Sequence, residues 1–166
     1  YPVSAMSCHV SACPNHQTGR TTPFATRGAV ASLGATGYEL DLTKLSEEEK
    51  VQVREQIENY KQIDELVLKG DLYRLADPFD GNYFCEMLVG KDKSKAYVVG
   101  ERFRADPCDH DRVLKLRGLD EGKTYAIREL NVTASGAALM GAGLFCPRLP
   151  DCGSWVWHIE EVNKKG

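Results

Sequence analysis

The sequence has 166 residues, of which 42% are hydrophobic and 27% are charged, and its formal net charge at pH 7 is -3. This composition is typical of a globular chain of one domain or a little more, and it argues against a disordered or fibrous protein. No basic stripe is present to neutralise phosphates, and no run approaches the roughly 18 apolar residues of a membrane span, so we expect neither a nucleic acid nor a membrane as a partner.

The first 70 residues alternate between two kinds of segment. Residues 3–11 are rich in small and β-compatible side chains and lead into a polar loop, which predicts a strand. A short helix is expected from Pro23 to the stop at Gly34, followed by a second strand over residues 35–42. With a further helix after it, this order predicts parallel strands joined by crossover helices, as in an α/β domain.

The stretch from Ser46 to Lys69 carries several agreeing helix signals. Ser46 and Glu49 have the spacing of a capping box, and Gly70 is a natural stop. Apolar side chains also recur at helical spacing, at Val53, Ile57, Tyr60, Ile63, Leu66 and Val67. We therefore expect a long helix with one apolar face.

After Gly70 the sequence consists of short strand-length runs separated by turn-forming groups such as Asp80-Gly81-Asn82. The runs cover residues 72–75, 83–89, 96–103, 112–116, 124–130 and 154–162, and only residues 137–140 indicate a helical turn. Strands at such spacing predict an antiparallel β-sandwich. We place the boundary between the two parts at residues 69–72, which gives domains over 1–70 and 71–166.

Four possible zinc ligands, Cys8, His9, Cys13 and His16, lie close together in the sequence. Neighbouring residues of a strand point to opposite faces, so Cys8 and His9 do not readily meet one ion, and the chain has no Cys-x-x-Cys pair. We therefore expect no metal site, with a zinc-stabilised fragment as the alternative. The wide, irregular spacing of the six cysteines favours reduced thiols and a cytoplasmic location.

The polar loop after the first strand holds the candidate binding residues. His9, Asn15 and His16 lie on or just after that strand, and in α/β barrels the loops after strands build the active site. It is an equally good interpretation that each histidine is structural and forms hydrogen bonds with the backbone. Glu39 and Asp41 resemble a carboxylate pair for acid/base chemistry, but Asp41 fits better as the start of the turn into the long helix.

Aromatic side chains are frequent in the second part, at Tyr73, Phe79, Tyr83, Phe84, Trp155 and Trp157. They would suit a sugar-stacking platform, and a non-catalytic carbohydrate-binding module is therefore an alternative function. Large aromatics at alternate strand positions more often fill a core. Exposure or burial of Trp155 and Trp157 separates the two interpretations.

Several runs resemble the bacterial α-galactosidases of glycoside hydrolase family 36. The resemblance covers effectively the whole chain, and its longest runs are Pro14-Asn15-His16-Gln17, Gly37-Tyr38-Glu39-Leu40-Asp41-Leu42 and Gly70-Asp71-Leu72-Tyr73-Arg74-Leu75. It implies that residues 1–70 are the seventh and eighth strand–helix units of a (β/α)8 barrel. It also implies that residues 71–166 are the C-terminal β-sandwich, so that the chain is a C-terminal fragment beginning in the middle of a gene.

The same resemblance implies retaining hydrolysis of terminal α-linked galactose, from oligosaccharides such as raffinose and melibiose, by two aspartates. Both would precede Tyr1, so no catalytic residue is assigned and the chain alone is expected to be inactive. His9, Asn15 and His16 would line the wall of the substrate pocket. No cofactor is expected, and the full-length enzyme would be a homo-oligomer; relatives that act on α-N-acetylgalactosamine or transfer galactose are alternatives.

Overall fold

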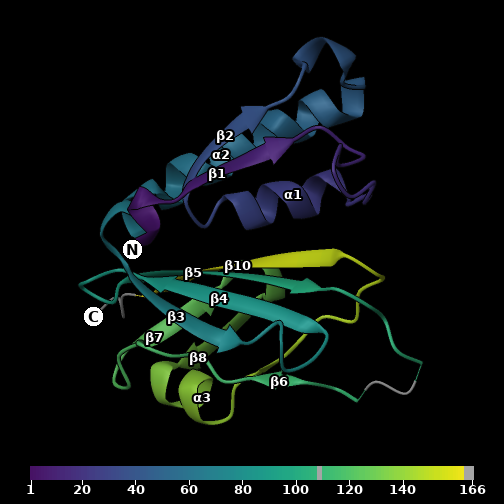
Figure 1. The fold of residues 1–166 in the computed structure, drawn as a ribbon. Coiled ribbons are helices and arrows are strands. Elements are labelled where there is room, and N and C mark those ends of the chain that lie inside the picture. Colours follow the sequence, from purple (N-terminus) through teal and green to yellow (C-terminus); the bar gives the residue numbers. More distant parts are fainter. Residues whose placement is uncertain (108–109, 163–166) are drawn as a thin grey trace.

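The computed structural model describes residues 1–107 and 110–162 (Figure 1). It has two parts that pack against each other, a strand and helix layer at the N-terminal end and a large antiparallel sheet after it. Cys108 lies outside the described residues. None of the described helices combines the length and the apolar character needed to cross a membrane.

The N-terminal part contains two parallel strands and the helices that follow them. Strand β1 pairs with β2 so that His9 lies opposite Gly37, and α1 is the crossover between them. The predicted first strand begins late, because residues 3–5 form a turn of 3₁₀ helix instead. The elements are β1 (Ser7–Ser11), α1 (Phe24–Ala31), β2 (Ala35–Glu39), a 3₁₀ turn η2 (Leu42–Lys44) and α2 (Glu47–Lys69).

Helix α2 begins and ends as predicted. The Ser46 side chain accepts a hydrogen bond from the Glu49 backbone N–H at 3.2 Å, and Glu49 Oε2 accepts one from the Ser46 N–H at 2.9 Å, which completes the capping box. Ile63, together with Leu66 and Val67, is buried against the sheet. Ile57, expected on the same apolar face, is 40% exposed, because the sheet covers only the C-terminal half of the helix.

The second part is built on a six-stranded antiparallel sheet with the strand order β3-β4-β5-β10-β7-β8. Its strands are β3 (Asp71–Ala76), β4 (Tyr83–Val89), β5 (Lys95–Arg102), β7 (Thr124–Ile127), β8 (Val132–Ser135) and β10 (Gly153–Glu161). A two-stranded sheet of β6 (Val113–Leu114) and β9 (Leu144–Phe145), the 3₁₀ turn η3 (Arg128–Leu130) and the helix α3 (Gly136–Gly141) complete it.

Every predicted strand-length run of the second part overlaps an observed strand, and the helical turn at residues 137–140 lies within α3. The run over residues 124–130 is a strand only to Ile127 and then turns into η3. Residues 112–116 contain only the two residues of β6. Strands β8 and β9 were not predicted.

The large sheet is buried on both faces. One face packs against α1 and α2 through a cluster that includes Leu88, Tyr97 and Val99. The other face, with Met87 and Trp157, is covered by the segments that carry β6, β9 and α3. The predicted antiparallel arrangement of the strands is confirmed by the pairing within the large sheet. The second sheet of the predicted sandwich consists, within the residues described, of the two short strands β6 and β9. In Figure 1, α1 lies between the parallel pair and the part of the sheet formed by β5 and β10.

Candidate functional site

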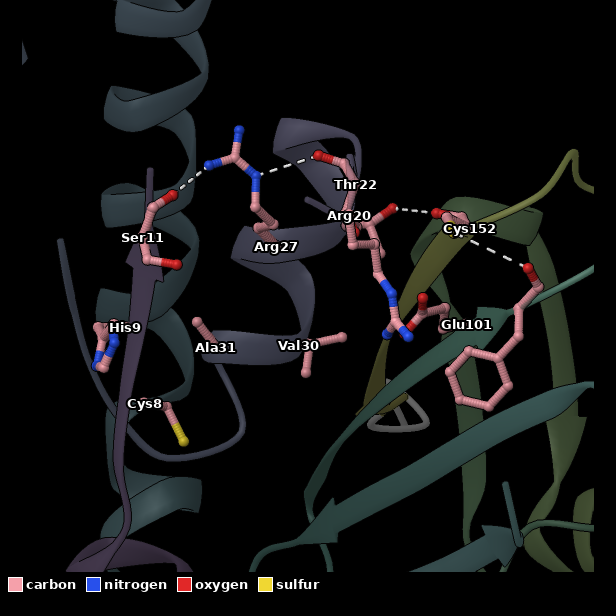
Figure 2. A pocket seen from close by; sticks show the side chains of 12 residues that line it. Cys8, His9, Ser11, Arg20, Thr22, Arg27, Val30, Ala31, Glu101 and Cys152 are labelled. Atoms are coloured by element: carbon pink, nitrogen blue, oxygen red, sulfur yellow. Dashed lines mark hydrogen bonds between the residues drawn. The ribbon is translucent and has the colours of Figure 1, made fainter. Parts of the chain in front are cut away.

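The face of β1 that points away from α1 carries a contact between a histidine and a carboxylate. Cys8 and Val10 pack in the cluster beneath the strand, whereas His9 points to the opposite side (Figure 2). His9 Nε2 lies 2.8 Å from Glu39 Oε2, and the two side chains are 47% and 74% exposed. A carboxylate thus orients an accessible imidazole beside the end of β2.

The loop after β1 is ordered by Asn15. The Asn15 side-chain oxygen accepts hydrogen bonds from the backbone N–H groups of Gln17 and Thr18, each at 3.0 Å, and from the Thr18 hydroxyl at 3.1 Å. Side chains of this type commonly build turns in this way. Asn15 therefore shapes the loop, and His16 is fully on its surface.

A cleft of about 710 Å³ lies between β1, α1 and the end of β5 (Figure 2). Its polar lining includes His9, Arg20, Arg27 and Glu101. Burial raises the pKa of Glu101, and the nearby Arg20 guanidinium opposes that shift. His9 lines this cleft and Asn15 lines a neighbouring hollow of about 340 Å³, whereas His16 lines neither. The three predicted residues therefore surround one loop without forming a single cluster.

Arg27 at the start of α1 holds the two ends of this loop. Its Nη1 donates to the Ser11 carbonyl at 2.5 Å and its Nε donates to the Thr22 carbonyl at 3.2 Å. Its guanidinium also lies 4.8 Å from the centre of the Phe24 ring. Sequence reasoning gave Arg27 no role, and the only signal was an arginine in a first helical turn after a polar loop.

The structure bears on two further hypotheses, the zinc site near Cys13 and the catalytic role of Asp41. Within the described residues, no group of three or more His, Cys, Asp or Glu side chains could hold a metal ion, and the Cys13 thiol donates to the Thr22 carbonyl at 3.7 Å. Asp41 accepts from the Thr43 N–H at 3.0 Å and from its hydroxyl at 2.6 Å, and these bonds lower the Asp41 pKa. Asp41 thus begins the η2 turn, as its position in the sequence indicated.

The sugar-stacking hypothesis is wrong for the two tryptophans. Trp155 is 8% exposed and Trp157 is 1% exposed, and Tyr83 packs beside Trp155. Phe79 is 97% exposed, but it lies on the loop between β3 and β4 and has no aromatic partner in the described part of the chain. The aromatic residues of the second part are mainly core residues, so they do not form a carbohydrate-binding platform.

Two family models match different stretches of the chain. Residues 1–70 match the family model described as Melibiase, and residues 83–159 match the Glycosyl hydrolase family 36 C-terminal domain. The first match covers the parallel strand pair with its helices, and the second lies within the antiparallel part. They place the chain among the glycoside hydrolase domain families.

The chain is 44% identical over 165 residues to the α-galactosidase AgaA of Geobacillus stearothermophilus. The aligned region covers 99% of this chain and 22% of AgaA. It is 46% identical over 147 residues to the bifunctional α-galactosidase/sucrose kinase AgaSK of Mediterraneibacter gnavus. That aligned region covers 89% of this chain and 16% of AgaSK. A crystal structure of an AgaA variant in complex with raffinose superposes with a TM-score of 0.94 at 44% identity, over 98% of this chain and 23% of that one. The chain belongs to glycoside hydrolase family 36.

Proposed function

We propose that the chain is the C-terminal portion of an α-galactosidase that releases terminal α-linked galactose from oligosaccharides such as raffinose and melibiose. The observation that carries the proposal is the match to AgaA, at 44% identity over 99% of this chain. Solved structures of AgaA variants contain raffinose in one case and stachyose in another. The shared chemistry of those sugars supports an oligosaccharide as the substrate.

We further propose that residues 1–70 are the last two strand–helix units of a (β/α)8 barrel and that residues 71–166 form the C-terminal β-sandwich domain. Within the described residues, β1 pairs only with β2, so its second edge is open to a preceding strand. Helix α1 packs on one face of this pair, and the small or polar residues Ser7, His9 and Gly37 are directed to the other. That division is expected of strands whose outer face meets helices and whose inner face lines a barrel.

In this arrangement His9, Asn15 and His16 belong to the wall of the substrate pocket, because active sites of such barrels lie at the carboxyl ends of the strands. Glu39 orients the His9 ring, which can then hydrogen bond a sugar hydroxyl. Asn15 keeps the loop in shape, and the exposed His16 is its contact with incoming substrate. The two catalytic aspartates are assigned to the portion of the enzyme that precedes Tyr1.

A chimaera tests the proposed function directly. Replacing the aligned segment of Geobacillus AgaA with residues 1–166 of this chain is expected to give an enzyme that hydrolyses p-nitrophenyl α-galactoside and raffinose, because the fold is the same. The chain alone and AgaA lacking the segment are expected to be inactive. A folded chimaera without activity, or an active isolated chain, would contradict the proposal, and activity on the α-N-acetylgalactosaminide instead would favour that relative.

The role of His9 can be measured in the same chimaera. His9→Ala is expected to lower kcat/KM about tenfold, since losing one hydrogen bond to a sugar hydroxyl costs on the order of 1–1.5 kcal/mol. Glu39→Gln is expected to have a smaller effect in the same direction, because a carboxamide still accepts from the ring. Thr21→Ala, at an exposed position of the same loop, is the control; an equal loss there would remove the specific role of His9.

We also propose a cytoplasmic location. Cys8, Cys13, Cys85 and Cys152 form no disulfide bond. Cys85 and Cys146 are buried, and burial raises the pKa of Cys85, which keeps it a thiol. Thiols outside a disulfide bond, such as those of Cys8, Cys13, Cys85 and Cys152, fit a reducing compartment.

A further inference from the structure

A chain of polar side chains, buried in its middle and exposed at Glu129, crosses the junction between the N-terminal helices and the large sheet. Glu129 of η3 contacts His158 of β10, His158 contacts Asn59 of α2, Asn59 contacts Tyr97 of β5, and Tyr97 contacts Ser32 after α1. His158 is 9% exposed, and Ser32 and Tyr97 are buried. Five side chains from both parts therefore form one continuous hydrogen-bond network.

The direction of each hydrogen bond can be followed from the Ser32 end. The Ser32 hydroxyl donates to the Ala29 carbonyl at 2.6 Å, which uses its only proton. At the 3.1 Å contact between Ser32 and Tyr97, the Tyr97 hydroxyl must therefore be the donor. Burial raises the pKa of Tyr97, so this hydroxyl keeps its proton. Tyr97 then has no proton left to donate to Asn59.

This fixes the orientation of the Asn59 amide. Asn59 must donate its Nδ2 to the Tyr97 hydroxyl, at 3.0 Å, and that places its Oδ1 against His158 Nε2, at 2.6 Å. An amide oxygen only accepts hydrogen bonds, so Nε2 must carry a proton. A neutral histidine with the proton on Nδ1 is incompatible with this arrangement.

The other ring nitrogen also faces an acceptor. His158 Nδ1 lies 2.6 Å from Glu129 Oε1, and the second carboxylate oxygen accepts the His158 backbone N–H at 2.8 Å. The oxygens of a carboxylate accept hydrogen bonds and donate none, so a hydrogen bond between Nδ1 and Oε1 needs a proton on Nδ1. We infer that His158 is a doubly protonated imidazolium at neutral pH, and that with Glu129 and Asn59 it forms a proton-dependent clamp between α2 and the sheet.

Among the described groups that contact the His158 ring, the Glu129 carboxylate is the one that can pair with an imidazolium. Tyr97 of β5 packs against the ring with centroids 5.0 Å apart, and Asn59 is the contact from α2. The nearby Arg128 is directed to Gln62 of α2 and to Glu160 of β10. The clamp requires both ring protons, because a ring nitrogen without its proton would place a lone pair against an acceptor oxygen, Glu129 Oε1 at Nδ1 or Asn59 Oδ1 at Nε2.

Nitrogen NMR of the histidine ring measures this protonation state without any substitution. In the uniformly ¹⁵N-labelled 166-residue chain at neutral pH, both ring nitrogens of His158 are expected to show chemical shifts of protonated nitrogens. A spectrum with Nε2 protonated and Nδ1 unprotonated would mean that the proton lies on Glu129 or is absent, and it would overturn the inference. The opposite tautomer would overturn it as well.

A pair of matched variants tests the clamp. Glu129→Gln removes the carboxylate and is expected to convert His158 to a neutral ring at the same pH, and to make hydrogen exchange at the α2 interface about tenfold faster. Glu160→Gln makes the same charge change on β10, where Glu160 pairs with Lys95 and Arg128, and is expected to leave the His158 shifts unchanged. Equal effects of the two variants, or an imidazolium retained in Glu129→Gln, would overturn the clamp.

Discussion

Trp157→Ala is expected to lower the free energy of unfolding by about 3–5 kcal/mol, the range for deleting a large buried aromatic side chain. Trp157 is 1% exposed, lies on the central strand β10, and its ring centroid is 6.0 Å from that of Trp155. Because the surrounding strands are fixed by their hydrogen bonds, they cannot close the resulting cavity. Urea denaturation followed by circular dichroism measures the change.

The matched control is the exposed aromatic residue Phe79. Its side chain is 97% exposed, so Phe79→Ala is expected to change stability by no more than about 0.5 kcal/mol. If Trp157→Ala were tolerated as well as Phe79→Ala, the described packing of the large sheet would be wrong. Such a result would mean that Trp157 is exposed, as a sugar-binding role requires.

Gly100→Ala is the second substitution with a large expected effect. A Cβ atom at Gly100 would lie 2.0 Å from Cζ2 of Trp155, much closer than any real contact. Trp155 is buried between Tyr83 and Trp157, so its ring cannot move away freely. We expect a loss of about 1–3 kcal/mol, as for other overpacked cores, measured as a lower midpoint of urea denaturation.

Gly37→Ala provides the comparison, because Gly37 is also a strand glycine but has no atom within 4 Å of an added Cβ. Alanine loses less conformational freedom on folding than glycine, so Gly37→Ala should be neutral or slightly stabilising. Destabilisation at Gly37 equal to that at Gly100 would show that the β-sheet backbone, and not the Trp155 ring, is responsible.

The sequence predicted the elements whose signals are local. The capping box at Ser46 and Glu49 and the stop at Gly70 define α2, and β4 occupies the predicted residues 83–89. Strands β8 and β9 escaped prediction because they have four and two residues, and because β9 pairs with a segment some 30 residues earlier. Alternation of apolar and polar residues is recognised only over about four to eight residues, so β9 is too short to show it and β8 is at the lower limit.

The candidate site was predicted only in part, for a related reason. The loop after β1 could be located because a polar segment follows a strand, but the contact of His9 with Glu39 depends on the register between two strands. The contact of His158 with Asn59 joins residues 99 positions apart. No local pattern in the sequence records a contact of that kind, since it is set by how α2 packs on the sheet.

The strand order of the large sheet has a consequence for synthesis of the protein. Strand β10 lies between β5 and β7, yet it is the last of the described strands to be translated. Until residue 161 leaves the ribosome, the facing edges of β5 and β7 have no partner, and the hairpins on either side cannot join. Completion of this sheet is therefore a late step after translation of β10, and the nascent chain exposes two open strand edges that chaperones or neighbouring nascent chains can bind.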